Sequence, residues 1–397
     1  METLQEKAVR PASSNWPDIV EAAVALRREL HREPELTWHE HGTAALIRRI
    51  LTEAKIAWKP CAVTGTVGML APNATGRHVA LRADIDALPI DEASGMEWSS
   101  RRLGCMHACG HDGHTATLMA AAWWLKNHEE ELPGPVSLLF QPAEEGGHGA
   151  KKMIEDGGLE GVEAIYGWHN WPALPLGKAV CPDGPVMGAN GTFLIEVRGV
   201  GGHASQPEEC RDPVLAACAI NMALQQIVSR RLSPHVPAVV SLTSIDAPSK
   251  ETVIPNVAHM AGSVRVGETE RRREIFELIE ETARQTAQVY GCEAGVELRP
   301  RYDATVNAPG EAARWREALT DEFGADWRAR EVALPVMASE DFSYYLNAIP
   351  GAFALVGMKE EEERALLHNP EYDFNDNVLG PAARMLVSLA GGPSPSA

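Results

Sequence analysis

The amino-acid sequence predicts an α/β protein in which a smaller α+β unit interrupts a larger domain with a mixed sheet. Two observations support this prediction: short apolar runs alternate with helical patterns, and this alternation changes after Cys181–Gly191. The chain of 397 residues is also too long for one ordinary hydrophobic core. We therefore expect one domain formed by residues 1–187 and 305–397, with a second domain of residues 188–304 inserted between them.

The first part of the chain contains the patterns of helices and buried strands. Apolar residues recur at helical spacing over residues 18–32 and 43–58 and over His114–Lys126. Short apolar runs predict strands at Val67–Leu70, His78–Arg82, Val136–Phe140 and Ala164–Tyr166. In such α/β sheets, ligands bind near the carboxyl ends of strands. Asp84 and the adjacent pair Glu144 and Glu145 stand at such ends.

The inserted part has a different order of elements, β-α-β-β-α-β. The predicted elements are, in chain order, Phe193–Val197, Asp212–Arg231, Val239–Ile245, Met260–Val266, Glu268–Tyr290 and Gly295–Arg299. This order is typical of a compact ferredoxin-like unit.

Composition limits the classes of partner and compartment. A net charge of −19 argues against nucleic acid or an anionic membrane as partner. Residues 1–20 lack the apolar core of a signal peptide, and the chain has no apolar run long enough to span a membrane. The seven cysteines are an odd number and widely scattered, which does not suit a disulfide framework. We therefore expect a cytoplasmic protein.

The segment Met106–His114 is rich in metal-binding residue types. It contains His107, Cys109, His111 and His114. Cys109 and His111 are two positions apart, so in an extended backbone their side chains would point to one side and could share a metal ion. The same segment could instead form a His-rich turn around a buried cysteine.

Glu144 and Glu145 end an apolar run in the sequence QPAEEGG, some thirty residues after this segment. Adjacent side chains diverge, which suits one metal ligand and one general base held on a single loop. Most such pairs are merely solvated charges, but the nearby Cys and His residues favour the catalytic interpretation. The combination predicts metal-assisted hydrolysis.

Three further histidines are weaker candidates when each is taken alone. His169 follows the predicted strand Ala164–Tyr166, and His368 lies in the sequence LLHNPEYDFND. Isolated histidines of this kind more often belong to the core or its rim. His203 lies in the glycine-rich sequence GVGGHASQP, where the backbone can approach a ligand closely.

Seven ordered motifs resemble those of aminoacylase-type metallo-amidohydrolases. They are LRADIDALP, MHACGHDGH, QPAEEGG, WHNWP, GGHASQP, SEDFS and HNPEYDFND, and the resemblance covers residues 20–390. The branch that the chain resembles is that of hippurate hydrolases and indole-3-acetyl-amino-acid hydrolases. The resemblance implies a catalytic domain with a dinuclear metal site and a lid domain through which subunits form a homodimer or homotetramer.

The same resemblance implies roles for individual residues. The metal ligands would be Cys109, His111, Glu145, His169 and His368. Glu144 would be the general base, His203 would stabilise the oxyanion, commonly in the partner subunit's site, and Asp84 would support the metal site. Two divalent ions per subunit are expected, zinc or manganese, with cobalt or nickel as further options.

Three positions in the inserted unit depart from the family pattern. Thr252 replaces an asparagine near the substrate carboxylate, Asn256 replaces an aspartate, and Gly191 stands where an aspartate is usual. Thr252 and Asn256 remain candidate substrate-binding residues. A hydroxyl reaches less far than an amide, so the recognition of a simple free α-carboxylate is open at this point.

The predicted function is therefore metal-dependent hydrolysis of the amide bond of N-acyl amino acids, which releases a carboxylate and a free amino acid. A metal-dependent dipeptidase or carboxypeptidase, or a hydrolase of an aryl amide or aryl amine, is the alternative. From other classes, a catalytically silent relative would have lost Glu144 or a ligand, and none is missing. A cysteine hydrolase using Cys109 with His111 or His114 would keep its activity in the presence of chelators.

Overall fold

The computed structural model describes residues 10–360 and 365–395, and the chain divides into two compact units. The first unit comprises the chain up to Val186, Val306–Val332 and the chain from Asp341 onward. The second comprises Met187–Thr305 and Ala333–Glu340. Sequence patterns gave no indication that residues 333–340 associate with the second unit. The strands β7 (Gly184–Met187) and β14 (Thr305–Asn307) contain the first two points at which the chain passes between units.

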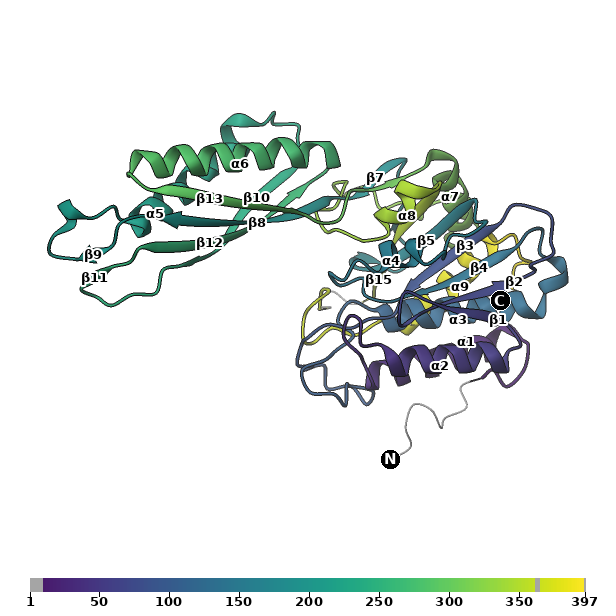
Figure 1. Cartoon of the computed structure of the whole chain (residues 1–397). Helices are drawn as coiled ribbons and strands as arrows, with labels where there is room; N and C mark the ends of the chain where they lie inside the picture. The colour runs from purple at the N-terminus through teal and green to yellow at the C-terminus, as the bar shows by residue number, and fades with distance from the viewer. Residues whose placement is uncertain (1–9, 361–364, 396–397) are drawn as a thin grey trace. The chain divides into compact units, whose positions relative to one another are not determined.

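The first unit is built on a mixed seven-stranded sheet with the order β1-β2-β4-β3-β5-β15-β6 (Figure 1). Strands β3, β4, β5 and β15 run parallel, whereas β1, β2 and β6 pair antiparallel with their neighbours. The bounds are β1 Ala57–Cys61, β2 Gly65–Leu70, β3 Val79–Asp84, β4 Val136–Gln141, β5 Ala164–Pro175, β6 Ala179–Val180 and β15 Gly351–Lys359.

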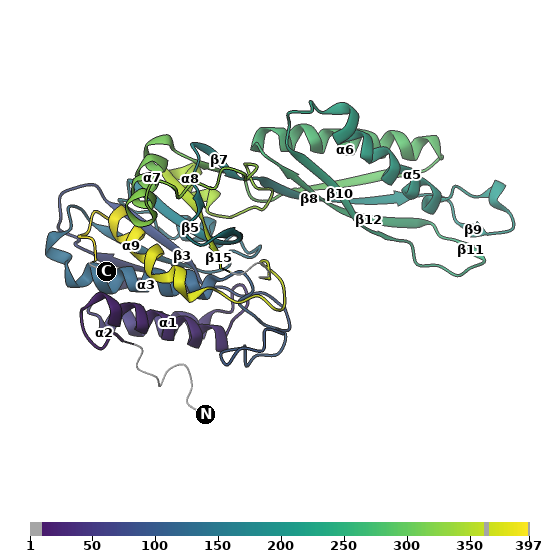
Figure 2. The ribbon, with the colours of Figure 1, turned by 180° about the vertical axis from the view of Figure 1, so that it is seen from behind.

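Helices lie on both faces of this sheet, as Figures 1 and 2 show from opposite sides. Helix α3 packs on β3, and α1 and α9 pack against α3, whereas α4 and α8 lie on the other face. The helices are α1 Trp16–Arg32, α2 His41–Glu53, α3 His111–Asn127, α4 Gly149–Glu155, α7 Pro309–Phe323, α8 Ser343–Ala348 and α9 Leu379–Leu389, with short 3₁₀ turns at Glu129–Glu131 and Asp376–Val378.

The burial of these segments agrees with the secondary structure that each adopts. All residues of β3 and β4 are buried, as expected for central strands that are covered on both faces. Helix α3 is buried along nearly its whole length and is accordingly apolar around most of its circumference. The side chain of Asn15 accepts a hydrogen bond from the backbone N–H of Asp18 and so caps the start of α1.

Three local predictions need correction. Strand β5 continues to Pro175, so His169 lies within the strand rather than after it. Helix α2 ends at Glu53, and Lys55 has a positive φ of 56°, so the predicted helix over residues 43–58 is too long. Helix α3 begins at His111 rather than at His114.

The second unit is a four-stranded antiparallel sheet with the order β10-β12-β8-β13. Its strands are β8 Ala189–Arg198, β10 Ala238–Asp246, β12 Val257–Val266 and β13 Glu293–Pro300. Helices α5 (Pro213–Gln226) and α6 (Thr269–Val289) cover one face, and a 3₁₀ turn (Pro207–Glu209) and a π-helical turn (Ile227–Arg231) flank α5. The element order and strand order are those of a ferredoxin-like unit. The predicted fold class is therefore confirmed.

A two-stranded ribbon extends this unit. Strands β9 (Gly202–His203) and β11 (Val253–Ile254) pair antiparallel, with His203 opposite Val253. The ribbon therefore brings together the two loops that carry the candidate residues His203 and Thr252.

Candidate metal centre and catalytic site

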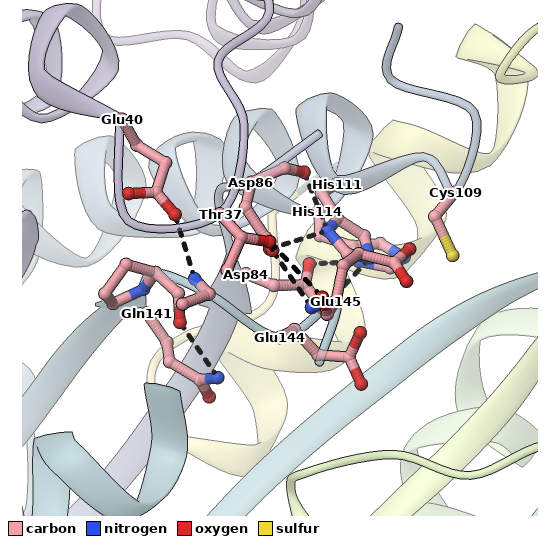
Figure 3. A network of polar contacts seen from close by, with 12 residues as sticks. Thr37, Glu40, Asp84, Asp86, Cys109, His111, His114, Gln141, Glu144 and Glu145 are labelled. Carbon is pink, nitrogen blue, oxygen red and sulfur yellow. Dashed lines mark hydrogen bonds and ion pairs between the residues drawn. The ribbon is translucent and has the colours of Figure 1, made fainter. Parts of the chain in front are cut away.

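A tight loop after β4 carries the two glutamates (Figure 3). Ala143 and Gly146, on either side of the pair, both have positive φ, of 56° and 85°. At the end of the loop, the backbone N–H of Gly149 donates to the carbonyl of Ala143, and a Cβ at Gly149 would lie only 1.6 Å from the carbonyl oxygen of Pro142. The QPAEEGG sequence thus allows a sharply folded loop at the carboxyl end of a central strand.

The Cys-Gly-His segment turns sharply between its two candidate ligands. Gly110 has a φ of 89°, and His111 is the first residue of α3, so the expected extended backbone is not present. A Cβ at Gly110 would lie 2.6 Å from both the Oδ1 atom of Asn170 and the hydroxyl of Tyr372. Only glycine fits this turn without strain, and the turn brings Cys109 and His111 to the same site by a different geometry from the one expected.

The structure brings the five predicted ligands and Glu144 together. Three overlapping sets have donor atoms within 4.8 Å of one another: Cys109, His111 and His169; Cys109, Glu145 and His368; and His111, Glu144 and Glu145. The Sγ atom of Cys109 lies 3.4 Å from Nε2 of His169, and Nε2 of His368 lies 3.2 Å from Oε1 of Glu145. These residues come from four separate stretches of the chain: the start of α3, the loop after β4, strand β5 and the loop before α9.

Asp86, which was not among the predicted site residues, links two of these groups. Its backbone carbonyl lies 2.9 Å from Nδ1 of His111, and its Oδ2 atom accepts a hydrogen bond from the backbone N–H of Glu145. The hydroxyl of Thr37 donates to the same Oδ2 atom. Figure 3 shows these contacts converging on Asp86. Such a partner fixes the orientation of a histidine ring and leaves Nε2 directed at the site.

Asp84 contacts two histidines of the site. Its Oδ1 atom lies 2.6 Å from Nδ1 of His114, and its Oδ2 atom lies 3.6 Å from Nε2 of His111. Burial opposes ionisation, but Arg82, His111 and His114 hold the pKa of Asp84 well below its usual range. His114 also accepts a hydrogen bond at Nε2 from the backbone N–H of Asn170, so both of its nitrogens are engaged.

The donor set fits a divalent cation. Nε2 of His111 and Oε1 of Glu145 are buried and make no hydrogen bond within the described residues. Burial and the neighbouring His114 depress the pKa of His169, which keeps its imidazole neutral, the form that binds metals. Burial and the carboxylates of Glu145 and Glu144 raise the pKa of the Cys109 thiol, so a nearby positive charge is needed to form the thiolate.

The other predicted site residues lie together in the second unit. The backbone N–H of Ala204, next to His203, donates to the carbonyl of Thr252. The side-chain oxygen of Asn256 accepts from the backbone N–H of Gly201 at 2.8 Å, so this residue holds the loop that leads to His203. The glycine at 191 has a packing reason, because a Cβ there would lie 2.5 Å from the ring of Phe276.

The tryptophans beside His169 have different surroundings. Trp168 is buried and packs edge-on against His114 and Phe374. Trp171 is half-buried, with its ring centre 6.2 Å from that of His169. Trp168 is therefore part of the packing that supports the site, whereas Trp171 lies beside His169 and is only half-buried.

Comparison with known proteins agrees with this site. The profile of peptidase family M20/M25/M40 matches residues 80–391. IAA-amino acid hydrolase ILR1-like 2 of Arabidopsis thaliana is 40% identical over 98% of this chain and 88% of its own length. Hippurate hydrolase of Campylobacter jejuni is 36% identical over 92% of this chain and 94% of its own length.

A solved structure gives the same result. The YXEP protein of Bacillus subtilis, described as a dinuclear metal binding peptidase from the M20 family, matches with a TM-score of 0.81 and 34% identity, over 94% of this chain and 98% of its own. The relatives confirm the predicted branch of hippurate and indole-3-acetyl-amino-acid hydrolases. The chain therefore belongs to peptidase family M20/M25/M40 and is a metal-dependent amidohydrolase.

Proposed function

We propose that this protein hydrolyses the amide bond of N-acyl amino acids and releases a carboxylate and a free amino acid. The observation that carries the proposal is the convergence of Glu144 with Cys, His and Glu donor atoms near the carboxyl edge of one sheet. Relatives named for acting on indole-3-acetyl-amino acids and on hippurate, both N-acyl amino acids, support this substrate class.

Two divalent ions would be held by Cys109, His111, Glu145, His169 and His368, whose donor atoms form overlapping sets that share Cys109. When bound, such ions polarise the amide carbonyl and lower the pKa of a coordinated water. Zinc or manganese suits the mixture of a thiolate, imidazoles and a carboxylate, and cobalt or nickel would also be accepted.

Glu144 acts as the general base. It takes a proton from the attacking water while the water oxygen bonds to the acyl carbon, and it then gives that proton to the nitrogen as the carbon–nitrogen bond breaks. The side chain is buried, and its Oε1 atom accepts a hydrogen bond from the backbone N–H of Asp341 at 3.3 Å, which helps to orient the carboxylate. His203 stabilises the oxyanion of the tetrahedral intermediate, from the lid of a second copy of the chain.

The second unit, which corresponds to the expected lid domain, also mediates dimerisation. Strand β10 is an edge strand of its sheet, with no neighbour on its outer side within the described residues. Helix α5 packs beside β10 and presents an apolar stripe to solvent, with Leu215 55% and Met222 73% exposed. An unpaired edge next to exposed apolar side chains favours pairing with a second copy.

The protein works in the cytoplasm. All seven cysteines are free thiols, and six of them are buried, an arrangement that suits a reducing compartment. No helix of the described residues is long and apolar enough to cross a membrane.

The test is amine release from a panel of N-acetyl, N-benzoyl and N-indoleacetyl amino acids together with dipeptides, at a fixed concentration of manganese or zinc. We expect metal-dependent release from at least one acyl-amino acid. Release from dipeptides alone would favour a dipeptidase. In that case Thr252 would be the first residue to replace. No release from any member with metal bound would contradict the proposal.

A further inference from the structure

We propose that Asp341 is a positioning residue that holds the catalytic loop, residues 141–150, in the shape that aims Glu144 at the substrate. The inference rests on the proposed role of Glu144 as general base. Asp341 belongs to the SEDFS sequence and lies some two hundred residues from the loop in the chain, yet it contacts the loop at its start, its middle and its end.

The three contacts come from one fully buried residue. At the start of the loop, Nε2 of Gln141 donates to both carboxylate oxygens of Asp341, at 2.8 and 2.9 Å. At the end, the backbone N–H of Ala150 donates to Oδ2 at 2.9 Å. In the middle, the backbone N–H of Asp341 itself donates to Oε1 of Glu144. The side chain thus fixes both ends of the loop while the main chain fixes the base.

A buried cation keeps this carboxylate in place. Nη2 of Arg82 lies 3.1 Å from Oδ1 of Asp341, and its Nε atom donates to Oε1 of Gln141. The same guanidinium pairs with Asp84, so it links the loop to the residue that supports His111 and His114. A charge-assisted network without solvent contact holds its members more rigidly than an exposed one. Such support suits this loop because Ala143, which is not a glycine, holds a positive φ of 56° there.

Asp341 is also the first residue of the first unit after the chain returns from Ala333–Glu340. It is therefore covalently attached to a segment of the second unit. Because the backbone N–H of Asp341 donates to Glu144, the base is hydrogen-bonded to the point at which that segment ends.

The experiment compares Asp341→Asn with Glu311→Gln in the full-length, metal-loaded protein. Glu311 is a matched control because it is also a buried acid that pairs with an arginine, Arg77. Within the described part of the chain, its hydrogen-bond partners are Arg77 and Tyr166, neither of which belongs to the proposed site. For Asp341→Asn we expect kcat to fall roughly 10- to 100-fold, with KM changed less than about twofold and metal content unchanged. Glu311→Gln should leave kcat unaltered. Ala150→Pro removes the N–H that donates to Asp341 in the first turn of α4, and it should also lower kcat, but by less than Asp341→Asn.

A double-mutant cycle decides whether Asp341 acts through Glu144. In a Glu144→Asp background the base is already withdrawn by one methylene, so Asp341→Asn should cost less than about threefold in kcat. An equal fold loss in both backgrounds, or a rise in KM at constant kcat, would overturn the proposal. Full activity of both Glu144→Asp and Glu144→Gln would instead refute the role of Glu144, which is a separate failure of the proposed function.

Discussion

The carboxylate of Asp86 accepts a hydrogen bond from the backbone N–H of Glu145, with 2.9 Å between Oδ2 and the nitrogen. Because the carbonyl of Asp86 also faces Nδ1 of His111, one residue after β3 orients two of the proposed ligands. Asp86 thereby fixes the position of the His111 ring relative to the catalytic loop.

Removing this link should weaken metal binding. Asp86→Ala is expected to lower metal affinity roughly 10- to 100-fold, because the loop loses an acceptor for the backbone of Glu145. Asp86→Asn keeps an acceptor oxygen and should lose less. Titration of the metal-free proteins with a competing chelator measures both, and equal affinity of wild type and Asp86→Ala would show that Asp86 does not support the site.

The two glutamates should separate into a base and a ligand. Glu144→Gln is expected to lower kcat by roughly 100-fold or more at unchanged metal content, because the proton acceptor is lost and the ligands are not. Glu145→Gln should instead lower the metal content. Elemental analysis beside steady-state rates distinguishes the two, and loss of metal in Glu144→Gln would mean that the roles are reversed.

Glu40 should make stability depend on pH. Burial, with a smaller effect of Asp86, raises the pKa of this carboxyl to about 7, against an ordinary value of 4.5. Its raised pKa therefore adds stability below about pH 4.5 that is lost as the pH rises through 7, by up to about 3 kcal/mol.

Glu40→Gln measures this contribution. The amide can still accept from the backbone N–H groups of Trp38 and Ala143, and it can donate to Thr64. Relative to wild type, the variant should therefore be more stable at pH 8 than at pH 5 in thermal or denaturant unfolding. The same difference at both pH values would contradict the assignment.

Asn256 should act through the loop that carries His203. Asn256→Ala removes the acceptor for the N–H of Gly201 and is expected to lower kcat, whereas Asn256→Asp keeps that acceptor and should remain close to wild type. Steady-state rates of the two variants check this. If Asn256→Asp instead raises KM strongly, Asn256 contacts the substrate directly.

Much of the fold could be predicted because its central elements carry strong local patterns. Strands β3 and β4 are mostly apolar and buried throughout, and buried residues recur at helical spacing in α6. Strand β1 was missed because four of its five residues are exposed and include Pro60. Strand β5 was predicted too short because it continues through polar and aromatic residues, which are buried only by their tertiary neighbours.

The sequence allowed the candidate ligands and the base to be predicted, but not the residues that hold them in place. Cys109, His111 and the two glutamates stand out by spacing, whereas Asp86 and Asp341 look like ordinary acidic residues in the sequence. Their contacts with the catalytic loop join segments 59 and 191 to 200 positions apart, a separation that no local pattern reports. In the sequence, the one feature that points to Asp86 is its position two residues after Asp84 in LRADIDALP.

The most direct test of the central claim is the rate of N-acyl amino acid hydrolysis as metal is added back to the metal-free protein. We predict no activity without metal and a rise that saturates near two equivalents of manganese or zinc per subunit. Activity that persists without metal and is lost on alkylation of Cys109 would contradict this account and favour a cysteine hydrolase.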